Sequence, residues 1–234
     1  MNFSIIIPLF NEEKNIKSLI DEIILSIPKK KYVFEIILVN DCSTDNTLIN
    51  IKKIQKNLPN LINIIKNNKN IGQSYSLIKG IKSSKYNNIL TIDGDGQNNP
   101  LDIPKLLDLY FSKYNFSLVA GIRKRRRDTI IKIISSRIAN KVRNFILKDN
   151  CSDTGCSLKI FDKRIFQSFP EFNSIHRFLP ALFNGYGNKI KFIDVDHRIR
   201  KYGVSSYGTL DRLYKGIFDM LKVYRIINNY KMKK

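Results

Sequence analysis

The 234-residue chain is poor in cysteine, and this scarcity excludes one class of protein. Its three cysteines, Cys42, Cys151 and Cys156, lack the number and dense spacing of the disulfide framework of a secreted scaffold. Cys151 and Cys156 also lack the second pair of ligands that would complete a structural zinc site. The cysteines therefore predict reduced thiols and a cytosolic setting.

Long apolar runs are absent as well. No stretch reaches the roughly 18 consecutive apolar residues that a transmembrane helix needs. The apolar part of the N-terminal segment is short and is interrupted by Pro8, which is not typical of a signal peptide. With 43% apolar and 26% charged residues, the sequence predicts a globular chain without a transmembrane helix.

Acidic residues are in short supply. Lys and Arg number 41 against 20 Asp and Glu, which gives a formal net charge of +21. Part of this surplus reflects a composition rich in Lys, Asn and Ile. The remainder implies an anionic partner, which is a nucleic acid, a phosphorylated ligand or a membrane surface.

Apolar runs alternate with amphipathic patterns along most of the chain. This order predicts an α/β fold with a mainly parallel sheet and helices on both faces. The expected strands are 3–10, 34–40, 61–67, 87–93, 116–123 and 189–200, with a turn entering a strand at 151–161. The expected helices are 12–27, 44–58, 72–84, 100–113, 130–148, 176–187 and 208–229.

Polar clusters follow three of the expected strands. They read "PLFNEE", "VNDCSTDNT" and "TIDGDGQ". In open parallel sheets, ligands bind beyond the carboxyl ends of the strands. We therefore expect the three clusters to converge on one rim of the sheet.

The third cluster holds two carboxylates one residue apart, Asp93 and Asp95. Hard oxygen ligands at this spacing can hold Mg²⁺ or Mn²⁺ and leave positions for phosphate oxygens and water. Gly94 and Gly96 let the backbone turn tightly near a ligand. The alternative is a solvated acidic turn, which an isolated Asp-x-Asp does not exclude.

The other two clusters contain further candidates. Asp41, at the end of a strand, can accept hydrogen bonds from a nucleobase or a ribose. Ser43, Thr44 and Asp45 are favoured as caps of the following helix. Glu12 is either a ligand or an acid placed in the first turn of a helix by the helix dipole.

Taken together, these motifs resemble those of family 2 glycosyltransferases of the nucleotide-diphospho-sugar transferase fold, known as GT-A. The motifs that carry the resemblance are "SIIIPLFNEEKNI", "EIILVNDCSTDNT", "NIGQSYSLIKGI" and "ILTIDGDGQNNP". The second half, with "DTGCSLKIF", "HRFLPAL" and "HRIRKYGVSSYG", resembles the polyprenyl-phosphate branch, the dolichol-phosphate mannosyltransferase-like enzymes. The resemblance covers nearly the whole chain.

The resemblance implies a role for individual residues. Metal ligands would be Asp93, Asp95 and Gln97, with Mg²⁺ or Mn²⁺ as the cofactor. Catalysis would depend on Asp95, Arg123 and Arg200, and the acceptor would be bound by Arg123, Arg177 and Arg200. The donor would be bound by Pro8, Phe10, Glu12, Val39, Asp41, Asp93, Gly94, Asp95 and Gln97.

Two positions depart from the family pattern. Ser206 stands where members commonly have Lys, so one phosphate-binding cation is missing, and Lys201 or Arg198 is a candidate substitute. Asn99 precedes Pro100, so the second proline that usually follows the metal motif is incomplete. Neither departure removes an expected metal ligand.

By resemblance, the expected reaction is an inverting transfer of sugar from a nucleotide sugar, GDP-mannose or a UDP-sugar, to undecaprenyl or dolichyl phosphate. A phosphate acceptor is already anionic, so it needs no strong general base, and the enzyme positions groups and stabilises charge. His176 and His197 are accordingly expected to be structural or to support other side chains.

The acceptor lipid places the protein at a membrane. We expect it to be peripheral on the cytoplasmic face, with a GT-A domain over 1–204 and a helical extension over 205–234. The basic run 123–127 and the amphipathic helix 130–148 form a candidate docking surface, and the alternative is an ordinary packed helix beside a solvated loop. A membrane-protein partner or a homo-oligomer is also possible for the C-terminal helix.

Three other functions are less favoured. A glycosyltransferase acting on a saccharide or protein hydroxyl would need a base, and its second half would not resemble the lipid-phosphate branch. A basic nucleic-acid-binding module, suggested by "RKRRRD", leaves the acidic rim unexplained. A Rossmann dehydrogenase would carry Gly-x-Gly-x-x-Gly after its first strand, and this sequence has no such motif there.

Overall fold

A computed structural model describes residues 1–124, 142–200, 202 and 209–232. Over these residues, seven strands form a sheet of order β3-β2-β1-β4-β6-β5-β7. The strands are β1 (Asn2–Leu9), β2 (Val33–Asn40), β3 (Ile62–Lys66), β4 (Asn88–Thr91), β5 (Leu118–Arg123), β6 (Lys159–Asp162) and β7 (Ile190–Val195).

The sheet is mainly parallel, as predicted. β1 pairs in parallel with β2 and β4, β2 with β3, and β5 with β7. The exception is β6, which runs antiparallel between β4 and β5. The sequence pattern did not predict this reversal, because a strand's direction depends on how the chain returns to the sheet.

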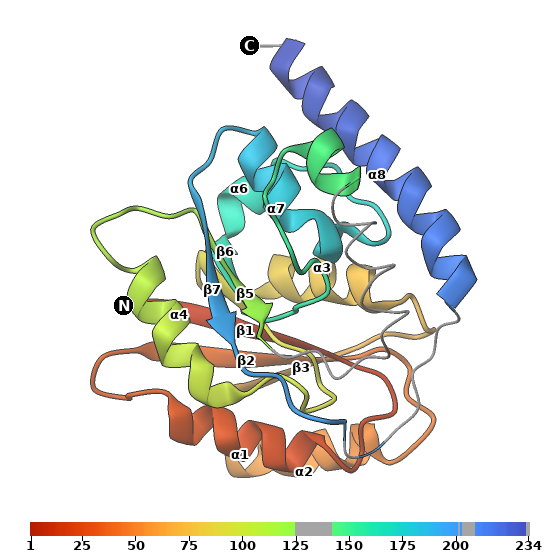
Figure 1. Ribbon diagram of the computed structural model, residues 1–234. Helices are drawn as coiled ribbons and strands as arrows, with labels where there is room; N and C mark the ends of the chain where they lie inside the picture. Colours follow the sequence, from red (N-terminus) through yellow and green to blue (C-terminus); the bar gives the residue numbers. More distant parts are fainter. Residues whose placement is uncertain (125–141, 201, 203–208, 233–234) are drawn as a thin grey trace.

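Helices cover both faces of the sheet (Figure 1). One face packs against α1 (Ile16–Ser26), α2 (Thr47–Asn57), the short 3₁₀ helix η1 (Pro100–Asp102) and α4 (Ile103–Tyr110). The other packs against α3 (Gln73–Ser83), α6 (Lys163–Gln167) and α7 (Ile175–Gly185). Alternate residues of β1 serve the two cores, with Ile5 and Ile7 on the first face and Ile6 on the second.

The first two helices begin later than predicted. α1 starts at Ile16 rather than residue 12, and residues 13–15 before it form a turn in which the Glu12 carbonyl accepts the N–H groups of Asn15 and Ile16 at 3.1 Å. α2 starts at Thr47 rather than residue 44, and Asp45 accepts the Thr47 N–H at 2.9 Å. In both cases the residues that were predicted to be helical, but precede the helix, belong to the rim.

β7 ends at Val195, five residues short of the predicted strand end at residue 200. Beyond it, the chain crosses to the loop after β4, where Asn98 and His197 form a β-bridge. The Arg198 N–H donates to the Gln97 carbonyl at 2.8 Å. This crossing carries the segment up to Arg200 onto the rim.

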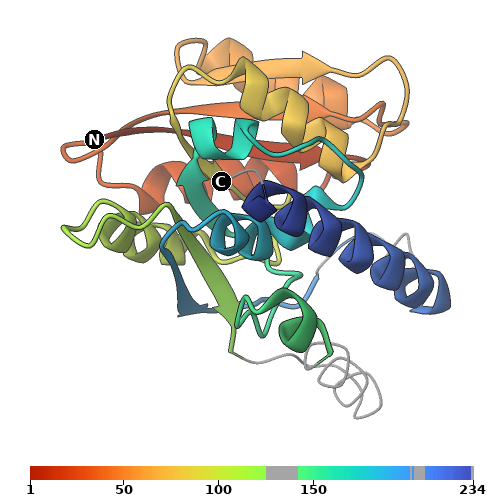
Figure 2. The ribbon, with the colours of Figure 1, turned by 90° about the horizontal axis from the view of Figure 1, so that it is seen from above.

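The last helix, α8 (Thr209–Met232), lies outside α7 (Figures 1 and 2). The rings of Tyr186 and Tyr230 stack at 3.7 Å between centroids, and an added Cβ at Gly185 would lie 2.6 Å from Ile227 Cγ1. Within the described ranges, none of the helices has the length and apolarity to cross a membrane. The predicted domain boundary after residue 204 falls outside the described residues and stays a prediction.

The predicted amphipathic helix 130–148 is described only at its end. Residues 142–147 are helical there, and Val142 and Phe145 are 49% and 84% exposed. Residues 125–141, with most of the predicted basic run and docking helix, lie outside the described residues.

The close packing of α3 on the sheet gives a test of the fold. An added Cβ at Gly80 would lie 2.5 Å from Ile6 Cγ2 and 3.0 Å from Val39 Cγ2. We expect Gly80→Val to lower the free energy of unfolding by about 1–3 kcal/mol through overpacking, as measured by urea denaturation.

Gly216→Ala is the matched control for this substitution. Nothing lies within 4 Å of an added Cβ at Gly216, in α8. The control should unfold at the same or a higher urea concentration. Equal stability of Gly80→Val and wild type would contradict the packing described here.

Candidate active site at the strand rim

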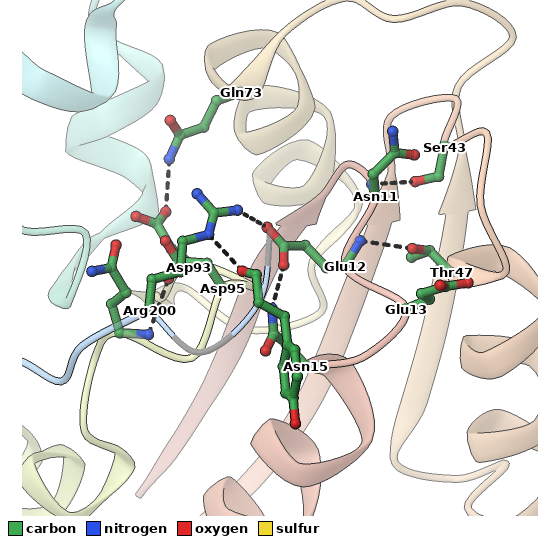
Figure 3. A network of polar contacts seen from close by, with 12 residues as sticks. Asn11, Glu12, Glu13, Asn15, Ser43, Thr47, Gln73, Asp93, Asp95 and Arg200 are labelled. Atoms are coloured by element: carbon green, nitrogen blue, oxygen red, sulfur yellow. Dashed lines mark hydrogen bonds and ion pairs between the residues drawn. The ribbon is translucent and has the colours of Figure 1, made fainter. Parts of the chain in front are cut away.

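The carboxyl ends of β1, β2 and β4 meet the segment that follows β7 at one rim of the sheet. Figure 3 shows Glu12 after β1, Asp93 and Asp95 after β4, and Arg200 from the crossing segment close together. The predicted convergence of polar clusters is therefore present. It is assembled from residues nearly 190 positions apart, since the Arg200 guanidinium reaches Glu12.

Asp93 and Asp95 are held on one tight turn. An added Cβ at Gly94 would lie 2.4 Å from Leu9 Cδ2 and 3.3 Å from the Pro8 carbonyl oxygen, so only glycine lets this turn lie against the end of β1. Gly96 follows with a φ of +72°, a left-handed conformation that glycine adopts freely.

Each carboxylate of the turn has a defined partner. Asp93 Oδ1 accepts from Gln73 Nε2 at 2.7 Å, and its backbone N–H donates to Ser157 Oγ at 3.1 Å. Asp95 Oδ1 accepts the Gln97 N–H at 3.0 Å. One oxygen of each group is thereby oriented by the protein.

Burial, followed by repulsion from Asp95, raises the pKa of Asp93 to about 6. Ser157, Lys159 and Arg123 act in the opposite direction and limit the shift of this pKa. The energetic penalty of ionising Asp93 beside Asp95 would be removed by a cation bound to the pair.

The oxygen donors of this turn fit a partial site for a hard divalent ion. Among the residues that the structure describes, no three His, Cys, Asp or Glu side chains form a metal-binding group. Mg²⁺ is often held by one or two carboxylates and completes its shell with water and substrate phosphates. Two carboxylates suit that mode, whereas they do not suit a closed structural metal site.

Glu12 and Arg200 form an ion pair across the rim. Arg200 Nη2 donates to Glu12 Oε1 at 2.8 Å, and Arg200 Nε donates to the Tyr202 carbonyl at 2.9 Å. Glu12 Oε2 accepts from Asn15 Nδ2 at 2.7 Å. Burial raises the pKa of Glu12, while Asn15 and Arg200 oppose that rise. Glu12 is therefore a rim residue ahead of α1, not an acid in the first turn of that helix.

Asp41 organises the loop that precedes α3. It is 3% exposed, and its carboxylate accepts from Asn67 Nδ2 and the Ile71 N–H at 2.9 Å and from the Gly72 N–H at 2.8 Å. Of the other expected donor-binding residues, Phe10 is 40% exposed at the rim, while the Val39 side chain is fully buried in the core. Any contact of Val39 with a donor would have to use its backbone.

Arg123 is held by a carboxylate that the sequence analysis did not single out. Its Nε and Nη2 donate to Asp153 Oδ2 and Oδ1 at 2.6 and 2.7 Å, and Nη1 lies 3.4 Å from His197 Nε2. An added Cβ at Gly155 would lie 2.8 Å from Arg123 Nη2. The signal was the Asp-x-Gly within "DTGCSLKIF", an acid and a glycine ahead of a strand.

A pocket of about 100 Å³ opens beside Asp93 and contains Lys159, His176 and Arg177 in its lining. Lys159 is 2% exposed and was not predicted, although a lysine inside the apolar strand pattern "SLKIF" was visible. His176 was expected to be structural, and its Nδ1 lies 2.7 Å from Ser74 Oγ.

The candidate substitutes for the missing phosphate-binding lysine have different outcomes. Arg198 is engaged elsewhere, because it donates to Glu22 Oε2 at 2.5 Å and to Asn99 Oδ1 at 2.6 Å. Lys201 and Ser206 lie outside the described residues. The other departure, Asn99, caps η1 by accepting the Leu101 N–H at 3.2 Å.

The pKa of Asp93 gives a testable pH dependence. The folded protein holds this proton more tightly than the unfolded chain, whose ordinary value is 3.8. The carboxylate therefore lowers the free energy of unfolding progressively as pH rises from about 4 to 6. In EDTA at pH 8, the free energy of unfolding of Asp93→Asn should be about 1–2 kcal/mol higher than that of wild type, and the difference should vanish near pH 4.

Urea denaturation across this pH range measures the effect, and Asp153→Asn provides the contrast. That variant leaves the half-buried Arg123 without its bidentate partner and should be less stable than wild type at pH 8. A stabilisation by Asp93→Asn that did not change with pH would show that the carboxylate's charge is not its cause.

Comparison with known proteins places this site among related sequences. Residues 4–169 match the family described as Glycosyl transferase family 2. The chain is 33% identical over 226 residues to a dodecaprenyl-phosphate galacturonate synthase of Rhizobium johnstonii, covering 95% of the chain and 66% of that protein. It is 28% identical over 220 residues to an undecaprenyl-phosphate 4-deoxy-4-formamido-L-arabinose transferase of Pectobacterium atrosepticum, covering 94% and 66%. The chain thus spans about two thirds of the length of these relatives.

Solved structures share the fold at low sequence identity. A glucosyl-3-phosphoglycerate synthase from Mycobacterium tuberculosis, in complex with Mn²⁺, UDP and phosphoglyceric acid, has a TM-score of 0.68 at 16% identity, covering 95% of this chain and 78% of that one. A mannosyltransferase from Pyrobaculum calidifontis, in complex with GDP-Man and Mn²⁺, has a TM-score of 0.61 at 16% identity, covering 86% and 58%. These likenesses confirm the predicted GT-A fold.

Proposed function

The chain belongs to glycosyl transferase family 2, and from this premise we propose that it transfers a sugar from a nucleotide sugar to a polyprenyl phosphate. The product is a sugar linked to a lipid phosphate. The main structural support for this proposal is the rim where Asp93 and Asp95 lie close to Arg200. The names of two relatives, both polyprenyl-phosphate transferases, support the choice of acceptor.

The donor spans the rim from β2 to β4 in this proposal. Asp41 lies after β2 and is suited to the nucleoside, with Pro8, Phe10 and Glu12 after or at the end of β1 beside it. The diphosphate then lies at the turn after β4, at Asp93 and Asp95. Either GDP-mannose or a UDP-sugar fits this layout.

Mg²⁺ or Mn²⁺ would be held by Asp93 and Asp95, with Gln97 as the third expected ligand. When bound, the ion supplies charge that stabilises the departing nucleoside diphosphate. Two structural neighbours have Mn²⁺ in their complexes, which supports the use of a divalent ion in this fold.

The protein's own groups position an acceptor that is already charged. Arg123 and Arg200 present guanidinium groups that can bind phosphate oxygens in bidentate geometry. Asp153 and Glu12 hold these two arginines in place before a phosphate arrives. The acceptor phosphate attacks the anomeric carbon directly, which inverts its configuration and requires no general base.

The acceptor lipid brings the protein to a membrane surface, and we place it on the cytoplasmic face. Phe218, Leu221 and Tyr224 of α8 are exposed, and Lys222 and Arg225 lie on the same helix. Val142 and Phe145 are also exposed. Apolar and basic side chains of this kind favour the interface of an anionic bilayer.

Asp95→Ala tests the carboxylate turn. We expect transfer from a nucleotide sugar to undecaprenyl phosphate to fall by about 10³-fold or more. The reason is that Asp95 would hold the divalent ion whose charge stabilises the leaving diphosphate. The lipid product is measured by mass spectrometry with Mn²⁺ present, and EDTA should abolish it in wild type.

Asp21→Asn is the control, since Asp21 is an exposed carboxylate paired with Lys17 at 2.9 Å on α1. It should retain wild-type transfer. Full transfer by Asp95→Ala, or by wild type in EDTA, would exclude the proposed metal role. A water-soluble glycan product without any lipid product would exclude the proposed acceptor.

The stereochemistry gives a separate prediction. A donor with an α-linked sugar should give a β-linked lipid phosphate, because a single displacement inverts the anomeric centre. The anomeric coupling constant of the purified product in NMR measures this. Retention of the α configuration would require a two-step mechanism and an enzyme nucleophile that the proposal does not contain.

A further inference from the structure

The pocket beside Asp93 lies on the side of the site opposite to Asp41. Across the sheet the order is β2, β1, β4 and β6, with Asp41 after β2, the carboxylate turn after β4, and Lys159 on β6. If the nucleoside binds near Asp41 and the diphosphate at the turn, the transferred sugar extends towards β6. This step rests on the proposed function.

Lys159 is an unusual residue to find in that pocket wall. Its side chain is buried, and among the described residues its ammonium makes one hydrogen bond, to the Cys156 carbonyl. An ammonium group has three donors, and burying it without partners is costly. Lys159 is among the residues that line the pocket, so a ligand bound there would lie beside its side chain.

Two further donors come from the start of α7. Burial, and then the neighbouring charges of Lys159 and Arg177, lower the pKa of His176 to about 3, so this ring is neutral. Ser74 Oγ accepts the Ser174 N–H at 2.7 Å and lies 2.7 Å from His176 Nδ1, so it can donate its own proton to that nitrogen. We assign the ring proton to Nε2, which makes His176 a neutral donor beside two cations.

The charge of the pocket favours an anion. Lys159 and Arg177 are cations, His176 and Thr154 can donate hydrogen bonds, and Asp93 is the one acid among the described residues that line the pocket. Asp93 is also the residue expected to be neutralised by a metal ion. Neutral sugar hydroxyls do not require two buried or half-buried cations, whereas a carboxylate or a phosphate does.

The size of the pocket distinguishes between these anions. About 100 Å³ has room for several water molecules, which suits a small terminal group but not a polyprenyl chain. The phosphate of the acceptor carries that chain, while the sugar is the free end of the donor. A carboxylate on the sugar therefore fits better than the acceptor's phosphate.

We propose that this pocket is the donor-sugar subsite and that Lys159, Arg177 and His176 recognise a carboxylate on the transferred sugar. The preferred donors are then nucleotide-linked hexuronates. Lys159 is the specificity-determining residue, since it contributes a buried charge that no neutral sugar satisfies.

Matched donor pairs test the proposal with the wild-type chain. The pairs are UDP-galacturonate and UDP-galactose, UDP-glucuronate and UDP-glucose, and GDP-mannuronate and GDP-mannose, each with Mn²⁺ and undecaprenyl phosphate. In the pair with the accepted base and stereochemistry, kcat/KM should be at least about tenfold higher for the acid, as expected for one charge-assisted hydrogen bond. Equal use of acid and neutral donors would overturn the proposal.

Lys159→Gln separates the charge from the rest of the site. It should lower the ratio of kcat/KM for the acidic donor to kcat/KM for the matched neutral donor by about tenfold or more, because only the acidic donor loses a charge-assisted hydrogen bond. Binding of UDP without a sugar, measured by calorimetry, should be unchanged if the variant is folded. Lys105→Gln is the control, because Lys105 Nζ also donates to a backbone carbonyl, that of Asp194 at 2.7 Å, but is exposed.

Other outcomes assign the pocket differently. If Lys159→Gln raises KM for undecaprenyl phosphate by the same factor with every donor, the anion is the acceptor's phosphate and the proposal is wrong. If wild type transfers no sugar from any donor, the proposed function fails. Calorimetry then still tests the assignment of the pocket, since the proposal requires a UDP-hexuronate to bind more tightly than the matching UDP-hexose. A variant that does not fold leaves the wild-type comparison decisive.

Discussion

Repulsion between Asp93 and Asp95 is the constraint around which the rim is built. Gly94 fits against Leu9 and the Pro8 carbonyl, so the turn cannot move away to separate the two charges. The protein compensates from the side, where Lys159 and Arg123 act on Asp93 electrostatically. A partly compensated pair of this kind is stable enough to fold and still gains from binding a cation.

Carboxylates also control the arginines that face this pair. Arg123 is held by Asp153 and Arg200 by Glu12, so each guanidinium is oriented before any phosphate is present. The side-chain entropy of ordering Arg is then lost on folding rather than on binding. In the proposed function, an incoming phosphate would have to share or displace these carboxylates, which would favour ligands of higher charge over weakly charged ones.

The sequence predicted what depends on local pattern. Apolar runs located the strands, and the polar residues after them located the rim with Asp41, Asp93 and Asp95. It did not predict features that depend on how distant segments of the chain come together. These are the antiparallel direction of β6, the pairing of Asp153 with Arg123, and the burial of Lys159. The late start of α1 was also missed, and Glu12, which the pattern placed in that helix, instead pairs with Arg200 from the other end of the sequence.

The positive surplus of the sequence did not locate the site, and the structure explains why. At the rim and around it, arginines are matched by acids, in the pairs Arg123 with Asp153, Arg198 with Glu22 and Arg200 with Glu12. These ion pairs nearly balance the charge at the rim, so the net charge of +21 arises mainly from residues elsewhere in the chain. Within the described residues of the pocket, Lys159 departs from this pairing, since its ammonium contacts a carbonyl and no carboxylate. A buried cation that contacts no carboxylate, where the neighbouring arginines each contact one, is a more local indicator of ligand charge than a whole-chain count, because desolvation makes a buried charge unfavourable.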